Sequence, residues 1–148
     1  MIPLTEYALM HGLDHWDALN RAVDCGLDIH VYAHEYRDGS KVPTIDTAAE
    51  IAQEDPSLVS IRGTDKQTGL TAGDLSVVAA AGFDAPEVVD SLAGYVVVYP
   101  PEGEWGAARS REDGDWWLCY TTDGVVDESR SYGSLEAALA EATERNDD

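Results

Sequence analysis

Apolar and polar positions alternate most regularly in the last third of the chain. Asp113-Gly114 and Asp123-Gly124 separate stretches rich in aromatic and β-branched residues, and Asp-Gly is a strong hairpin signal. Beyond them, Ser134 is placed to cap a helix whose apolar side chains recur at helical spacing. The pattern predicts a four-stranded antiparallel meander with one packed helix, its strands lying at 95–99, 105–111, 115–122 and 125–132.

The expected third strand has large side chains on both faces. Trp116, Leu118 and Tyr120 form the more apolar set and are expected to face the helix, since side chains alternate along a strand. Trp117 and Cys119 then point the opposite way. Adjacent tryptophans cannot both face one core, so one of them is expected to be exposed, covered by the N-terminal part, or available to a partner.

Helical spacing dominates the start of the chain. After a short first helix, a second helix is expected over 15–24, with Asp14 as its N-cap. Trp16, Leu19 and Val23 fall at positions i, i+3 and i+7, so they share one face of this helix.

A hairpin is expected after the two helices. Residues 29–36 are rich in β-branched and aromatic side chains, and the turn Asp38-Gly39-Ser40 follows them. Residues 42–45 are the expected returning strand, and Asp46 or Thr47 is expected to cap another short helix.

This helix–turn–helix–hairpin order resembles the small winged helix-turn-helix domains of excisionase and MerR-type regulators. The resemblance covers a third of the chain and implies a second helix that enters the DNA major groove. It rests on pattern matches at Leu4-Thr5-Glu6-Tyr7-Ala8, His11-Gly12-Leu13, residues 18–23, Arg37-Asp38-Gly39 and Thr44-Ile45-Asp46.

The charge of the second helix departs from that family. Asp14, Asp17 and Asp24 lie in or beside it, and Arg21 is its single Lys or Arg residue. Phosphates would repel these carboxylates. The expected wing holds Arg37 and Lys41 but also Glu35 and Asp38. The resemblance therefore predicts a fold for this segment and argues against ordinary DNA binding.

The middle of the chain is less regular. A strand is expected near 58–62, a helix over 72–81, and another short helix beginning at Pro86. The whole chain is expected to be an α+β protein. Its expected parts are a winged-helix-like unit, a helical connector, and an antiparallel sheet with a C-terminal helix, spanning 1–53, 54–94 and 95–148.

Net charge is the strongest compositional feature of the chain. There are 29 acidic and 9 basic residues among 148, a net charge of −20. A compact chain of this length is roughly 38 Å across, and duplex DNA of that length carries about 22 charges. Such a field repels nucleic acid and membrane surfaces and attracts basic partners.

The acidity also has a second explanation that involves no binding function. Aspartates outnumber glutamates 17 to 12, and Lys41 and Lys66 are the two lysines. Proteins of salt-adapted organisms and many acidic proteins of GC-rich genomes have this composition. Composition alone leaves open whether the charge reflects function or habitat.

The chain has no signature of catalysis, and we expect it not to be an enzyme. His11 and His15, with His30, His34 and Cys25, are the residues to consider as metal ligands. The first pair spans a predicted turn, and the second would be about 13 Å apart along a strand. Paired carboxylates arise by chance among so many acids. We therefore expect no metal and no cofactor.

The sequence favours a cytoplasmic protein. It has no apolar run approaching the roughly 18 residues of a membrane span, and no basic and apolar leader. Cys25 and Cys119 are expected to be reduced thiols.

The preferred function is an acidic protein-binding inhibitor, encoded by a phage or mobile element. By charge and size, the chain is similar to anti-CRISPR and anti-restriction DNA mimics, which implies a basic surface of a nucleic-acid-binding complex as partner. The alternative is a winged-helix DNA-binding transcriptional regulator from an acidic-proteome or halophilic host. The residues expected to bind the partner are Asp14, Asp17, Glu35, Asp113, Asp115, Trp116, Trp117, Asp127 and Glu128.

We expect no measurable affinity for random-sequence duplex DNA near physiological salt. The physical reason is the net charge of −20 together with the acidic second helix. Fluorescence anisotropy with a labelled duplex checks this. A micromolar signal that weakens as salt is added would contradict it, because such binding requires a basic face.

Overall fold

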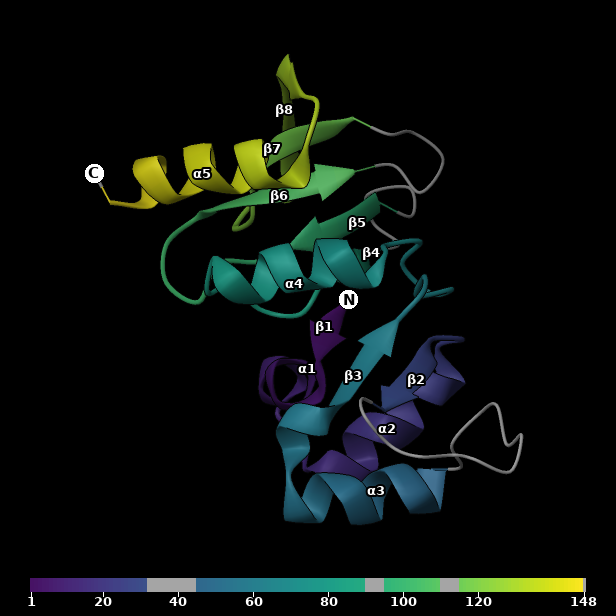
Figure 1. The fold of residues 1–148 in the computed structure, drawn as a ribbon. Coiled ribbons are helices and arrows are strands. Elements are labelled where there is room, and N and C mark those ends of the chain that lie inside the picture. The colour runs from purple at the N-terminus through teal and green to yellow at the C-terminus, as the bar shows by residue number, and fades with distance from the viewer. Residues whose placement is uncertain (32–44, 90–94, 110–114, 148) are drawn as a thin grey trace. The chain divides into compact units, whose positions relative to one another are not determined.

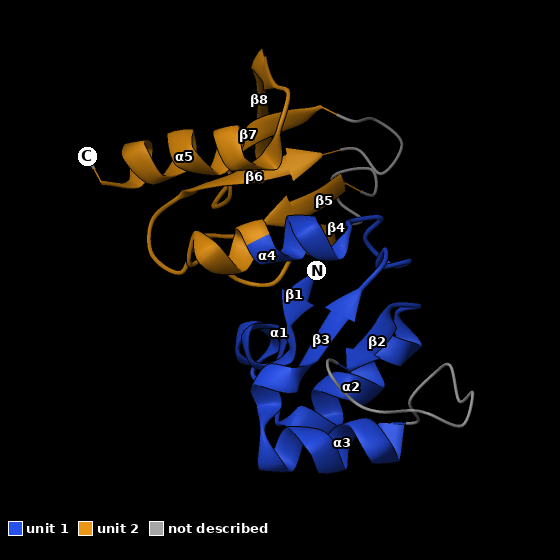
Figure 2. Ribbon diagram, viewed as in Figure 1, with its two compact units in different colours: residues 1–76 blue, residues 77–148 orange. Residues whose placement is uncertain are grey.

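The structure is a computed structural model that describes residues 1–31, 45–89, 95–109 and 115–147 (Figure 1). The chain divides into two compact units, Met1–Ser76 and Val77–Asp148 (Figure 2). Both combine helices with an antiparallel sheet, which confirms the predicted mixture of helix and sheet. The finer three-part division at residues 53 and 94 stays a prediction.

Unit 1 is built around a three-stranded antiparallel sheet in the order β1-β3-β2. Helix α4 (Ala72–Ala80) spans the boundary between the two units. The other elements, in chain order, are β1 (Ile2–Pro3), α1 (Leu4–His11), α2 (His15–Asp24), β2 (Asp28–Val31), α3 (Ile45–Glu54), the 3-10 turn η1 (Pro56–Leu58) and β3 (Val59–Arg62).

β2 has a partner strand that the sequence analysis did not predict. β2 pairs with β3, so that Ile29 lies opposite Ile61 and Val31 opposite Val59. Ile45, the last residue of the expected return strand, begins α3 instead. The expected hairpin turn lies outside the described residues. β3 takes the central position because its first three residues are buried, whereas β1 and β2 flank it.

The buried face of α2 also differs from the expectation. Ala18, Leu19 and Ala22 are buried, whereas Trp16 is 48% exposed and Val23 is 44% exposed. At 3.6 residues per turn, the two alanines lie on one side of Leu19, and Trp16 and Val23 lie on its other side. The small alanine side chains allow the neighbouring helices to approach closely, so the core forms on their side of the helix.

Unit 2 contains a five-stranded antiparallel sheet in the order β4-β5-β6-β7-β8. The sheet has one strand more than the four predicted, because β4 forms where a short helix starting at Pro86 was expected. The β-branched Val88 and Val89 pair with β5 there. The elements are β4 (Glu87–Val89), β5 (Tyr95–Val98), β6 (Trp105–Arg109), β7 (Trp116–Tyr120), β8 (Val125–Tyr132) and α5 (Leu135–Asn146).

Side chains are buried on both faces of this sheet. Trp116 and Leu118 are buried on one face, as predicted, and α5 packs against β6, β7 and β8. Val97, Ala108 and Cys119 form a fully buried cluster on the opposite face. Cys119 therefore belongs to a second apolar layer, and partly buried side chains of β4, β5 and β8 complete that layer.

Asn146 joins the end of α5 to the start of β6. Its side-chain Oδ1 accepts hydrogen bonds from the backbone N–H groups of Glu104 (3.1 Å) and Trp105 (2.8 Å). Its Nδ2 donates to the carbonyl oxygen of Trp105 at 2.8 Å. The side-chain amide thus hydrogen-bonds to the main chain as a neighbouring strand would. It satisfies three main-chain groups, the N–H of Glu104 and both the N–H and the carbonyl oxygen of Trp105.

We expect Asn146→Ala to lower the free energy of unfolding of the protein by about 1–3 kcal/mol, because three hydrogen bonds are lost together. Urea denaturation followed by circular dichroism measures this. Glu144→Ala, on the exposed side of the same helix, is the control and should change stability by less than about 0.5 kcal/mol. Equal stability of the two variants would contradict the structural role of Asn146.

Unit 1 encloses several polar groups beside its apolar core. The rings of Tyr7 and His11 contact each other, with centroids 4.6 Å apart. Nε2 of His11 is buried without a hydrogen-bond partner. Burial, together with the charge of Arg21, lowers the pKa of His11 to about 4. His11 is therefore neutral in the folded protein at neutral pH.

This burial should make the protein less stable as the pH falls from about 6.5 to about 4. In that range the unfolded chain binds a proton at His11 and the folded chain does not, so protonation favours unfolding. His11→Phe keeps a ring against Tyr7 and removes the titrating group. Urea denaturation at pH 7 and pH 5 should show a smaller loss of stability for this variant than for the wild type. Carboxylate titration is common to both proteins, and identical losses would show that His11 is not responsible.

Candidate partner-binding groove

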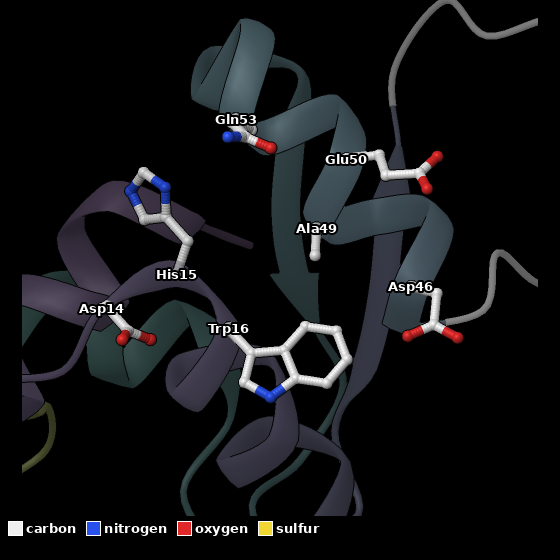
Figure 3. A pocket seen from close by; sticks show the side chains of 7 residues that line it. All are labelled: Asp14, His15, Trp16, Asp46, Ala49, Glu50 and Gln53. Carbon is white, nitrogen blue, oxygen red and sulfur yellow. The ribbon is translucent and has the colours of Figure 1, made fainter.

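An open groove of about 540 Å³ lies in unit 1 between α2 and α3 (Figure 3). Its walls combine carboxylates with one tryptophan, and both helices contribute. The residues that line it are Asp14, His15, Trp16, Asp46, Ala49, Glu50 and Gln53.

Local sequence signals place the α2 side of the groove. The carboxylate of Asp14 accepts a hydrogen bond from the backbone N–H of Asp17 at 2.8 Å, so Asp14 is the N-cap that the sequence predicted. This cap starts the helix immediately before His15 and Trp16. The side-chain amide of Asn20 donates to the carbonyl oxygen of Trp16 at 2.9 Å. Trp16 is therefore held in the first turn of α2, where its side chain is half exposed.

Helical spacing places the α3 side of the groove. Asp46, Ala49, Glu50 and Gln53 occupy positions i, i+3, i+4 and i+7 and therefore share one face of α3. The opposite face of the helix contains the buried residues Ala48 and Ala52. The acidic face is thus a consequence of the way α3 packs in unit 1.

The groove is electrostatically negative. Among the described residues, three carboxylates line it and no Lys or Arg does. The face of an indole ring also carries negative electrostatic potential and attracts cations. A groove of this composition favours a positively charged group and disfavours phosphate.

The residues that the sequence predicted for partner binding are divided between unit 1, unit 2 and the residues outside the described ranges. Asp14 and Asp17 belong to unit 1, whereas Glu35 and Asp113 lie outside the described residues. The predicted residues in unit 2 are Asp115, Trp116, Trp117, Asp127 and Glu128.

The Asp127 carboxylate is hydrogen-bonded to a residue of its own strand. Its carboxylate accepts hydrogen bonds from the backbone N–H (3.0 Å) and the hydroxyl (2.6 Å) of Ser129, which lower its pKa, and it lies 3.9 Å from Arg145. Asp115 and Glu128 are exposed. Of the predicted acids in unit 2, these two are more accessible to a partner.

The two adjacent tryptophans have different environments. Trp116 is 3% exposed, and Arg109 lies over its ring at 5.2 Å from the ring centroid. Trp117 is half-buried on the opposite face of the sheet. Trp116 therefore packs in the core, and Trp117 is the more accessible of the two.

Sequence reasoning did not identify the groove. Trp16 was assigned to an apolar helix face, and the acids of α3 were not considered as a group. The i, i+4 spacing of Asp46 and Glu50 was visible in the sequence, but the pairing of α2 with α3 was not. The exposed tryptophan becomes recognisable only when the buried side of α2 is known.

Metal sites and membrane-spanning helices are both absent from the described part of the chain. Residues 1–31, 45–89, 95–109 and 115–147 contain no group of three or more His, Cys, Asp or Glu side chains arranged to hold a metal ion. No helix in these ranges has the length and apolar character needed to span a membrane. Cys25 and Cys119 are both free and buried, and burial raises the pKa of both thiols.

Comparison with known protein families, with curated proteins and with solved structures finds no match for this chain.

Proposed function

We propose that this protein is an acidic inhibitor that binds the basic, nucleic-acid-binding surface of a DNA-handling complex and excludes DNA by mimicking its charge. The target class would be a CRISPR or restriction complex, and the protein would act in the cytoplasm on behalf of a phage or mobile element. It would need no cofactor and would catalyse no reaction.

The observation that supports this proposal best is that each unit is acidic by itself. Residues 1–76 include 13 acidic and 5 basic residues, and residues 77–148 include 16 and 4. The negative charge therefore does not come from a single tail or a single helix. A basic channel that grips DNA phosphates would meet carboxylates on either unit.

The charges on α2 favour this proposal over a DNA-binding regulator. Asp17 and Asp24 are exposed on α2, where a recognition helix would approach phosphates. Arg21 is partly buried, and its Nε atom is enclosed without a hydrogen-bond partner. Arg21 is therefore poorly placed to form part of a basic surface that contacts phosphates.

The test is competition with DNA. A labelled duplex is bound to purified CRISPR or restriction complexes, and the protein should displace it from its target, more weakly as salt is added. Joint reversal of four exposed acids, Asp17, Glu50, Asp115 and Glu128, to lysine should abolish displacement. Each single reversal should weaken it by about fivefold or less, since an exposed ion pair contributes about 0–1 kcal/mol.

A charge-matched variant separates a specific surface from net charge. Lysine at four other exposed acids, Glu6, Asp84, Glu102 and Glu144, gives the same total charge and should retain more displacement. Circular dichroism confirms that both variants fold. A target that binds equally at low and high salt, or that tolerates the first fourfold reversal, would show that the acidity reflects habitat.

A further inference from the structure

We infer that the groove between α2 and α3 receives an arginine side chain of the partner, with the guanidinium on the Trp16 ring and its N–H groups donating to Asp46 and Glu50. This inference rests on the proposed function, because it names the chemical group through which a basic partner would engage unit 1.

The exposure of Trp16 is the first observation behind this inference. A tryptophan has one of the largest apolar surfaces of any side chain, and here almost half of it is exposed, at 48%. The two carboxylates on the facing helix come from Asp46 and Glu50 (Figure 3). The groove thus combines an exposed aromatic surface with carboxylates on the facing helix.

In unit 2, two arginines of the same chain already lie over tryptophan rings. Arg145 lies 4.6 Å from the ring centroid of Trp105, and its Nε is 3.4 Å from a carboxylate oxygen of Glu141. Arg109 lies over Trp116 at 5.2 Å. Among the described residues, no Lys or Arg lies over Trp16, and none lines its groove. The described residues therefore supply no cation to the Trp16 ring.

The chemistry of the groove fits arginine better than lysine. A guanidinium is planar, stacks on an indole face and presents several N–H donors to carboxylates in a fixed geometry. An ammonium group is compact and more strongly hydrated, so it loses more solvation in such a site. The volume of about 540 Å³ lies within the range of roughly 300–1,000 Å³ found for ligand sites, so residues beside the arginine also have room to enter.

The direct test uses a blocked peptide with three arginines separated by glycine and serine, and the full-length protein labelled with nitrogen-15. The four indole N–H signals are followed by NMR, and Trp16→Phe identifies the signal of Trp16. The peptide should shift that signal in a saturable manner. A matched lysine peptide should bind at least threefold more weakly, and a citrulline peptide, which keeps the shape without the charge, should cause no shift at Trp16.

Matched variants test the role of each group. Trp16→Ala and Glu50→Gln should each weaken binding of the arginine peptide by about fivefold to tenfold, the effect expected of a cation–π contact or a charge-assisted hydrogen bond. Val23→Ala changes another exposed apolar residue of α2, and Glu54→Gln removes a charge from α3 outside the groove. These two controls should bind within twofold of the wild type. Binding by Glu50→Gln equal to that by Glu54→Gln would overturn the inference.

The peptide titration tests the groove and the competition assay tests the proposed function, so their outcomes can differ. If the arginine peptide leaves the Trp16 signal unchanged while the protein still displaces DNA from its target, the groove is not the arginine site and the proposed function stands. If the peptide saturates Trp16 and the variants behave as expected, but no DNA-handling complex is inhibited, the proposed function is wrong and the groove serves another basic partner.

Discussion

Mutual repulsion among carboxylates limits where the acids of this protein can lie and what can stabilise its fold. A chain with 29 acids and 9 bases cannot neutralise its charges by pairing them, so most of the acids must remain hydrated at the surface, although Asp65 is buried. Stability must then come from apolar burial. The core uses small residues, such as Ala18 and Ala22 in α2 and Ala48 in α3, so that helices pack closely. The acids are left on the outer faces of those helices.

Several of the aspartates have a local structural role as well as a charge. Asp14, Asp55, Asp65 and Asp127 each accept a hydrogen bond from a backbone N–H two or three residues further along the chain. The short aspartate side chain suits this geometry better than glutamate does. Turn and cap formation therefore explains part of the excess of aspartate over glutamate without reference to habitat or to a partner.

Local signals in the sequence predicted local structure well and long-range pairing poorly. The bounds of α2 and its Asp14 cap were predicted correctly, as were the bounds of β8, because caps and Asp-Gly turns act over a few residues. The pairing of β2 with β3 joins segments about thirty residues apart, and no local pattern specifies it. The groove was missed for the same reason, since α3 supplies half of it and the pairing of α2 with α3 is a tertiary feature.

The acidic groove has an energetic consequence for unit 1. Asp14, Asp46 and Glu50 line one open space, and like charges on neighbouring helices oppose the packing of α2 against α3. Trp16 is left half exposed beside them, so its apolar surface gains little from folding alone. A bound cation would screen the carboxylates and cover the indole together. Because any group that binds only the folded state stabilises it, a basic partner would strengthen the fold at the place where self-repulsion weakens it.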